Sequence, residues 1–125
     1  MIFKLKTGKT GEEKAVAFLK RNGYRIVERN FRNRLGEIDI VAKDKDVVCF
    51  VEVRTRRGPE KHGQALESIG RLKRQRLSKL ALSYLRGAGG EEQRARFDVI
   101  SVSLGDPAQE VILLKDAFPL DERYH

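Results

Sequence analysis

Two acidic residues, Asp39 and Glu52, lie on neighbouring segments whose alternating residues are typical of β-strands. Two carboxylates that face each other across a strand pair repel, and a divalent cation is the usual reason to tolerate them. Arg54 follows Glu52 by two residues and projects from the same strand face. These residue types favour oxygen-ligand metal chemistry, in which the ion activates water and offsets charge on a phosphate ester.

The same residues have a second interpretation. Charged side chains on the wet side of an antiparallel sheet are ordinary, and Asp39, Glu52 and Arg54 could form a cross-strand ladder of salt bridges. Charge clusters mark functional sites only statistically, so the pattern alone leaves both interpretations open.

A β-hairpin from Gly36 to Arg57 must position these residues. An even loop, either 45–46 or 43–46, places Asp39 and Glu52 on the same face, whereas an odd loop separates them. With the two-residue loop they lie directly opposite, with Cβ atoms about 4.5–5.5 Å apart. The loop length therefore decides whether the two carboxylates can share a cation.

The even register also gives the hairpin two unlike faces. One is entirely apolar and is predicted to be buried: Ile38, Ile40, Ala42, Val47, Cys49, Val51 and Val53. The other is apolar near the turn and charged at the far end: Val41, Val48, Phe50, Glu37, Asp39, Glu52, Arg54 and Arg56.

The other helices and strands are predicted from hydrophobic periodicity and from capping and turn residues. A helix is predicted from Gly11, with Thr10 as its cap and Gly23 as its stop. Strands are predicted at 24–30, 96–104 and 110–115, a connection at 31–35, and a second helix at 71–85 with a stripe of Leu77, Leu80, Ala81, Tyr84 and Leu85. Phe97, Val99, Leu113 and Phe118 are expected to complete the core.

Length and composition bound the class of protein. The 125 residues predict one domain, 1–125, with a basic mobile arm at 1–10 and a polar tail at 119–125. The net charge of +8 predicts a polyanionic partner, as in nucleic-acid-binding proteins. No run of residues has the length of a membrane span, and the single Cys49, expected in the core, agrees with a reducing cytoplasm.

Clustered cations mark candidate nucleic-acid contacts. They are Arg32 and Arg34 before the hairpin, Arg56 and Arg57 at its end, and Lys73, Arg74 and Arg76 at the start of the second helix. For each of them a solvated surface is the plain alternative. His62, in a Gly- and Pro-rich loop, is interpreted as a surface residue because no second His or Cys accompanies it at ligand spacing.

Five blocks in order, GEID, FVEVRTR, a Lys before a long helix, RFDV and KDAF, resemble the uncharacterised YraN-like family. That family is described as related to archaeal Holliday junction resolvases, and Asp39 with Glu52-Val53-Arg54 looks like the PD-(D/E)xK nuclease signature. The resemblance covers residues 11–118. It implies a mixed α/β, restriction-endonuclease-like fold, with a central mixed sheet of about five strands flanked by helices.

The resemblance also implies roles for residues. Asp39, Glu52 and the main-chain carbonyl of Val53 would ligate Mg²⁺ or Mn²⁺. Glu12, in the G-E-x-x-A spacing, would lean over the metal, although carboxylates are also favoured at a helix N-terminus without any function. Lys73 would lie near the scissile phosphate.

One position departs from the superfamily pattern. The superfamily usually has Lys where this chain has Arg54. Arginine stays protonated in proteins, so Arg54 is unsuited to act as a general base and suited to clamping a phosphate oxygen.

The predicted function is therefore a metal-dependent nuclease, with DNA, including branched DNA, as the expected substrate. A non-catalytic nucleic-acid-binding module and an assembly protein are the alternatives, because fold does not fix function. Resolution of a DNA junction would favour a homodimer, in which two sites address opposed strands.

Overall fold

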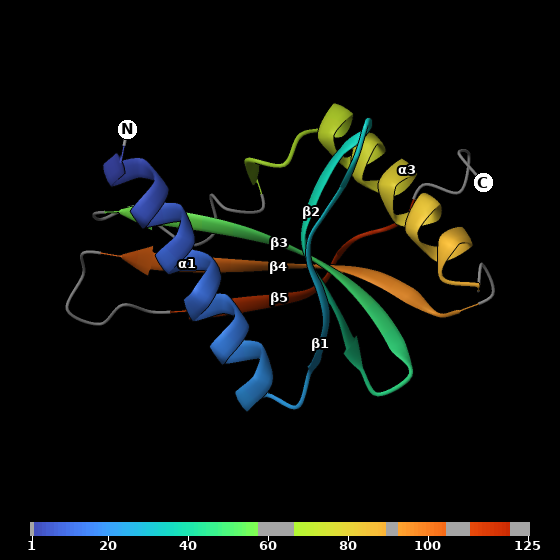
Figure 1. The fold of residues 1–125 in the computed structure, drawn as a ribbon, viewed down its shortest axis with the longest axis horizontal. Coiled ribbons are helices and arrows are strands. Elements are labelled where there is room, and N and C mark those ends of the chain that lie inside the picture. Colours follow the sequence, from blue (N-terminus) through green and yellow to red (C-terminus); the bar gives the residue numbers. More distant parts are fainter. Residues whose placement is uncertain (1, 58–66, 90–92, 105–110, 121–125) are drawn as a thin grey trace.

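A five-stranded sheet carries one helix on each face (Figure 1). The structure is a computed structural model that describes residues 2–57, 67–89, 93–104 and 111–120, with the backbone alone at 2–9 and 57. The elements in order are α1 (Ile2–Arg21), β1 (Arg25–Asn33), β2 (Gly36–Asp44), β3 (Val47–Arg57), α3 (Arg71–Gly87), β4 (Ala95–Leu104) and β5 (Val111–Phe118). This mixed α+β architecture agrees with the predicted restriction-endonuclease-like fold.

The strands lie side by side in chain order, β1-β2-β3-β4-β5. The pairs β1–β2, β2–β3 and β4–β5 are antiparallel, whereas β3 and β4 are parallel. A parallel pair needs a crossover connection, and α3 lies in that connection. The topology therefore places α3 directly after the strand that carries Glu52.

The β2–β3 hairpin has the predicted even register. Ile40 pairs with Val51, Ala42 with Cys49 and Asp44 with Val47, which leaves two residues in the turn. Both hairpin faces are buried, one under each helix. The α1 side contains Ile40, Ala42, Cys49 and Val51, and the α3 side contains Val41, Val48 and Phe50.

Ile38 corrects the predicted face assignment. It was expected beside Ile40, but it packs in the α3 cluster. The β2–β3 ladder ends at Ile40 and Val51, while the β1–β2 ladder continues to Asn33 and Gly36. Beyond Ile40, β2 leaves the sheet with β1 as a two-stranded ribbon, so alternation along the sheet no longer decides which side Ile38 faces.

Helix α1 begins earlier than predicted. Residues 2–10, expected as a mobile arm, are helical, and Thr10 lies inside the helix instead of capping it. The predicted stop is confirmed, because Gly23 has a positive φ of 86° and the Tyr24 N–H donates to the Leu19 carbonyl over 3.0 Å. Ala15 and Leu19 are fully buried against the sheet.

Helix α3 carries the predicted stripe, with Leu77, Leu80, Ala81 and Leu85 buried and Tyr84 partly buried. Tyr84 lies edge-on to Phe31 and to Phe50, with ring centroids 5.2 and 5.8 Å apart. Gly36 approaches the helix closely, since an added Cβ would lie 3.3 Å from Arg76 Cδ. These contacts hold the β1–β2 ribbon against α3.

Strand β1 is irregular near its start. The register of β1 against β2 shifts between Ile26 and Glu28, which places a β-bulge at Val27. β1 also extends to Asn33, so residues 31–33 of the predicted connection are strand, and only Arg34 and Leu35 form the turn.

The predicted core residues after the hairpin, and Cys49 within it, can be compared with the structure, whereas two other predictions concern residues that it does not describe. Phe97, Val99 and Phe118 are in the core and Leu113 is partly buried. Burial raises the pKa of the Cys49 thiol to about 12, in agreement with its predicted core position. His62 and residues 121–125 of the tail lie outside the described residues.

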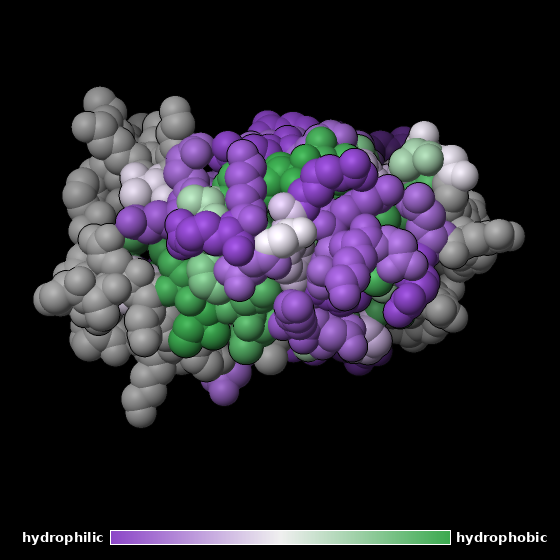
Figure 2. All heavy atoms as spheres, turned by 90° about the horizontal axis from the view of Figure 1, so that it is seen from below, coloured by the Kyte–Doolittle hydropathy of each residue, from purple (hydrophilic) through white to green (hydrophobic). Residues whose placement is uncertain are grey.

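One face of the molecule is mostly polar (Figure 2). Figure 2 shows a face dominated by hydrophilic residues, with a hydrophobic area at its lower left. Neither described helix combines the length and the apolar character needed to cross a membrane.

Candidate functional site

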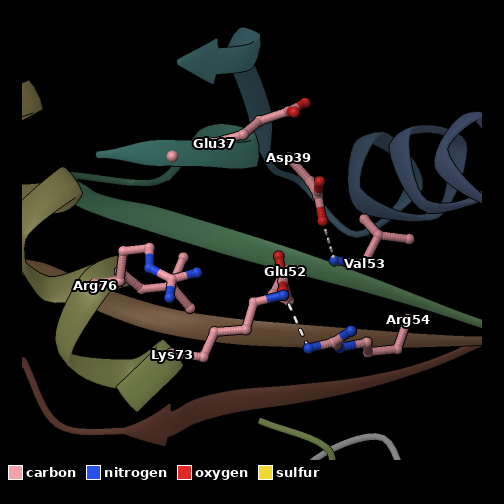
Figure 3. A pocket seen from close by; sticks show the side chains of 9 residues that line it. Glu37, Asp39, Glu52, Val53, Arg54, Lys73 and Arg76 are labelled. Atoms are coloured by element: carbon pink, nitrogen blue, oxygen red, sulfur yellow. Dashed lines mark hydrogen bonds and ion pairs between the residues drawn. The ribbon is translucent and has the colours of Figure 1, made fainter. Parts of the chain in front are cut away.

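Asp39 lies where β2 leaves β3. The last pair of the β2–β3 ladder is Ile40 with Val51, and the Val53 N–H, two residues further along β3, donates to Asp39 Oδ2 over 2.8 Å (Figure 3). The Asp39 carboxylate thus accepts a hydrogen bond that a main-chain carbonyl of β2 would accept if the ladder continued. This contact fixes the Asp39 side chain over β3 instead of leaving it in solvent.

Glu52, on β3, is the most buried charged side chain of the site, with 7% of its surface exposed. Its Oε2 lies 2.6 Å from Lys73 Nζ and 3.4 Å from an Arg54 terminal nitrogen. In Figure 3, Lys73 reaches Glu52 from α3 while Arg54 approaches from the opposite side. Glu52 is therefore held between two cations from different elements.

The electrostatics of the site show the cost of placing two carboxyl groups together. The pKa of Asp39 is raised from 3.8 to about 8, chiefly by burial and then by the negative charge of Glu52. The hydrogen bond from the Val53 N–H acts in the opposite direction. Asp39 is therefore largely protonated at neutral pH, until a cation compensates the two charges.

Two adjoining hollows, of about 320 and 390 Å³, open over these residues. Glu37, Asp39, Val53 and Arg54 line both of them. The first is completed by Gly36, Glu52, Lys73, Arg76 and Leu77, and the second by Glu12, Asn30, Thr55, Arg56 and Ser68. The site is thus an open, polar depression shared by α1, β1, β2, β3 and α3.

Glu12 reaches the second hollow because α1 packs unusually close to β3. A Cβ built on Gly11 would overlap Thr55 Oγ1 and lie 3.0 Å from Thr55 Cβ, so only glycine fits there. Glu12 is held by Arg29, at 2.9 Å, and by the Asn30 side chain, at 3.2 Å. Since α1 begins at Ile2, Glu12 lies in mid-helix, and the helix-terminus explanation for its presence does not apply.

The cations predicted from the sequence separate into three groups. Lys73, Arg54, Arg56 and Arg76 line the hollows. Arg32 and Arg34 are exposed on the β1–β2 ribbon, and Arg32 pairs with Glu37 at 3.4 Å. Arg74 is directed elsewhere, because its Nε donates to the Ile69 carbonyl and its guanidinium lies 5.1 Å from the Phe118 ring centroid. The Arg57 side chain lies outside the described residues.

Sequence reasoning assigned no role to several residues that line this depression, among them Asn30 and Glu37. Asn30 adopts a left-handed conformation, with φ of 56°, and donates to Glu12. Glu37 was placed on the charged face but was given no role, and it lines both hollows. The positive φ of Asn30 has no clear signature in the sequence. Glu37, in contrast, is two residues from Asp39 on the same strand, so the sequence already placed the two side chains on the same face.

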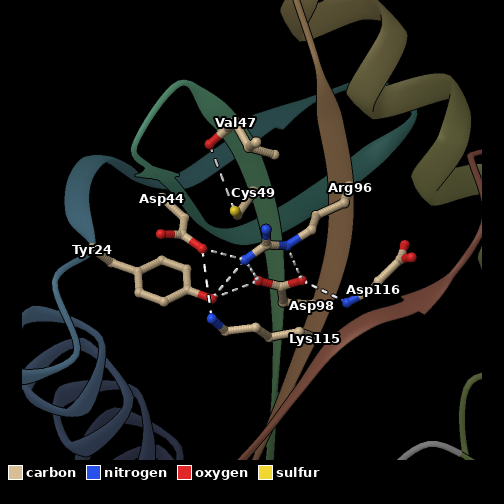
Figure 4. A network of polar contacts seen from close by, with 8 residues as sticks. All are labelled: Tyr24, Asp44, Val47, Cys49, Arg96, Asp98, Lys115 and Asp116. Carbon is tan, nitrogen blue, oxygen red and sulfur yellow. Dashed lines mark hydrogen bonds and ion pairs between the residues drawn. The ribbon is translucent and has the colours of Figure 1, made fainter.

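A second polar cluster explains the RFDV and KDAF blocks (Figure 4). Asp98 is fully buried on β4 and accepts hydrogen bonds from Tyr24, Arg96 and the Asp116 N–H, at 3.1, 2.9 and 2.9 Å. Arg96 also bonds Asp44 at 2.8 Å. The cluster joins Tyr24, just after α1, to the hairpin, β4 and β5, so its side chains hold these elements together.

The donor set for a metal is small. Within 2–57, 67–89, 93–104 and 111–120, no three Asp, Glu, His or Cys side chains are grouped so that they could hold an ion. A metal at this site would therefore depend on the Asp39 and Glu52 carboxylates together with main-chain, water or substrate oxygens.

Comparison with known proteins identifies the family. The model of the uncharacterised protein family UPF0102 matches residues 11–102. A UPF0102 protein of Syntrophus aciditrophicus is 47% identical over 124 residues, covering 96% of this chain and 97% of that protein. A UPF0102 protein of Symbiobacterium thermophilum is 44% identical over 114 residues, covering 90% and 96%, and one of Rhodococcus jostii is 39% identical over 119 residues, covering 94% and 100%. On this similarity, the chain belongs to the uncharacterised protein family UPF0102.

Proposed function

We propose that this protein is a metal-dependent nuclease that hydrolyses phosphodiester bonds of nucleic acid, with DNA, including branched DNA, as the expected substrate. The observation that carries the proposal is the convergence of Asp39 and Glu52 in a polar depression that Arg54, Lys73, Arg56 and Arg76 also line. Burial and the charge of Glu52 raise the pKa of Asp39 to about 8, so ionisation of both carboxyl groups is costly for the folded protein even with Lys73 and Arg54 beside Glu52.

The residues present fit a hard divalent cation. Mg²⁺ and Mn²⁺ prefer oxygen ligands, and Asp39 and Glu52 supply carboxylate oxygens. The N–H and C=O groups of one strand residue point to the same edge, so the Val53 carbonyl faces the side on which its N–H contacts Asp39. Bound there, the ion would supply Lewis acidity and an activated water.

Arg54 and Lys73 are the two cations beside Glu52 that could contact a phosphate. Arg54 remains protonated and offers a planar fork of donors, which suits it to holding a phosphate oxygen as charge accumulates during hydrolysis. Its Nε is buried and, among the described residues, has no hydrogen-bond partner. This donor could be satisfied by a bound phosphate oxygen. Lys73 reaches the same hollow from α3.

Exposed cations beside the site favour a nucleic acid over a small phosphate ester. Arg32 and Arg34 lie on the ribbon that forms one wall, and Arg76 lies on α3 at the other. The net charge of +8 would attract a polyanion over a larger distance.

The competing function is a nucleic-acid-binding module without turnover. It would use the same exposed cations and would need neither carboxylate. Removal of Asp39 would then leave its affinity for DNA unchanged or stronger, because a negative charge is lost.

A panel of labelled substrates separates these two functions. Duplex, single-stranded, flap and four-way DNA are incubated with Mg²⁺, with Mn²⁺ and with EDTA. The proposal predicts cleavage of at least one structure with metal and none with EDTA. Salt-sensitive binding of the panel without cleavage in either metal would instead support the binding module.

A further inference from the structure

The shortest ion pair of the site joins the residue proposed to bind metal to a lysine on another element. Lys73 Nζ lies 2.6 Å from Glu52 Oε2. Glu52 is almost entirely buried, whereas 39% of the Lys73 side chain is exposed. The ammonium group therefore occupies the solvent side of the carboxylate, where a cation entering from the hollow would approach Glu52.

A lysine and a divalent cation cannot both hold this oxygen closely. Their charges have the same sign, and at ion-pair distance in a partly buried site their repulsion is weakly screened. Arg54, which is on the same strand as Glu52, also contacts the Glu52 carboxylate, but at the longer distance of 3.4 Å. Lys73 is thus the cation that a metal would displace first.

The side chain of Lys73 is suited to such an exchange. Its ammonium is a compact point charge on a flexible four-carbon stem, unlike the planar fork of arginine. The backbone beneath it is fixed, because Leu77, one turn further along α3, is buried in the core. The head group could therefore move within the hollow while the helix stays in place.

We propose that Lys73 is an exchangeable counter-ion: it neutralises Glu52 when no metal is present, leaves Glu52 when a divalent cation binds, and then offers its ammonium to a substrate phosphate. This inference rests on the proposed function, since it concerns the same site. It adds that metal binding and phosphate binding are coupled through one side chain, and such coupling is reciprocal.

The first test measures Mn²⁺ affinity by calorimetry without nucleic acid, so it needs no activity. Lys73→Met removes the competing charge and retains the length of the side chain. We expect it to bind Mn²⁺ about tenfold more tightly than the wild type, within the range of typical coupling energies. Arg76→Met is the matched control, because Arg76 lies one turn along α3 and lines the same hollow. We expect its affinity to change by less than about threefold.

The outcomes distinguish the two proposals. Unchanged or weaker Mn²⁺ binding by folded Lys73→Met, with wild-type binding that is lost in Glu52→Gln, would overturn the exchange and leave the metal site intact. Mn²⁺ binding that Glu52→Gln does not alter would overturn the metal site itself, and with it the proposed function.

A second measurement uses the wild-type protein and so does not depend on the folding of a variant. Reductive methylation of lysines is followed by mass spectrometry with and without Mg²⁺. A released ammonium reacts faster than one held by Glu52, so the rate at Lys73 is expected to rise with Mg²⁺, whereas the rate at Lys79, on the exposed side of α3, is not. A rate at Lys73 that stays constant or falls would contradict the exchange.

Discussion

The Val53 N–H donates to the Asp39 carboxylate over 2.8 Å, although the ladder between their strands has already ended at Ile40 and Val51. A side chain thus continues the hydrogen bonding of β3 at the point where β2 leaves the sheet. This contact fixes Asp39 close to Glu52, whose charge raises the pKa of Asp39. The site therefore lies where β2 and β3 separate. The cost of ionising Asp39 there can be measured as a change in the free energy of unfolding with pH.

The first prediction concerns pH and stability. The pKa of Asp39 is about 8 in the folded protein, against about 3.9 for an unfolded Asp. The folded state therefore binds the proton more tightly, and the stability gained is complete below about pH 4 and is lost as the pH rises through about 8. Asp39→Asn cannot ionise and retains an oxygen acceptor for Val53. In EDTA at about pH 9 it should melt roughly 3–8 °C above the wild type, for about 1–2 kcal/mol.

This difference should shrink as the pH is lowered, and it should vanish below about pH 4, where Asp39 becomes protonated in both the folded and the unfolded wild type. Asp46→Asn, in the exposed turn of the same hairpin, is the control for loss of a carboxylate. Thermal melts across the pH range make the comparison. Equal melting temperatures of Asp39→Asn and the wild type at high pH would show that Asp39 is ionised at little cost.

The second prediction concerns Arg54. Arg54→Gln retains a polar side chain but removes the charge that we assign to a phosphate oxygen. Cleavage should fall about 10²–10³-fold, the usual effect of losing one electrostatic stabiliser. Mn²⁺ binding should persist, because Asp39 and Glu52 remain. Arg94→Gln, at an exposed position before β4, is the control. Full metal-dependent cleavage by Arg54→Gln would refute the role of this arginine.

The third prediction concerns the approach of α1 to β3. Gly11→Ala would introduce a Cβ that overlaps Thr55 Oγ1, so we expect a loss of about 1–3 kcal/mol in the free energy of unfolding. Thr55→Ala removes that oxygen and should restore part of the loss when the two changes are combined. Urea denaturation of the four proteins in the cycle gives the coupling between the residues. Additive effects would mean that the two side chains do not meet.

The fourth prediction separates the buried cluster from the proposed chemistry. Asp98→Asn leaves Arg96 without its buried charge partner and should cost about 3 kcal/mol. Tyr24→Phe removes the hydrogen bond that Tyr24 donates to Asp98 and the one that it accepts from Arg96, and should cost about 1–3 kcal/mol. Urea denaturation measures both losses. Because Tyr24 lines neither hollow, Mn²⁺ affinity of folded Tyr24→Phe should equal that of the wild type, and a changed affinity would contradict a purely structural cluster.

The convergence of Asp39 and Glu52 could be predicted from the alternation of side chains along two paired strands. Side chains alternate with a period of two, so the parity of a two-residue turn was enough to place Asp39 and Glu52 together. The length of α3 and its buried stripe followed from helical spacing in the same way. These features depend on local geometry, which the sequence expresses directly.

Features that depend on contacts between distant segments could not be predicted. Ile38 faces α3 because β2 separates from β3, and no residue near Ile38 signals that separation. Arg74 was grouped with Lys73 by charge, yet it contacts the Ile69 carbonyl and the Phe118 ring. The charge of a side chain is visible in the sequence, but the partner that it meets is set by tertiary packing.

The central claim is tested most directly by the rate of metal-dependent cleavage of the best DNA substrate, measured for the wild type, Asp39→Asn, Glu52→Gln and the control Asp46→Asn. We predict cleavage in Mg²⁺ or Mn²⁺ by the wild type and Asp46→Asn, and a loss of at least about 10²-fold in each of the other two variants, since both carboxylates are assigned to the metal. Cleavage that persists at the wild-type rate in Asp39→Asn and Glu52→Gln would contradict the account.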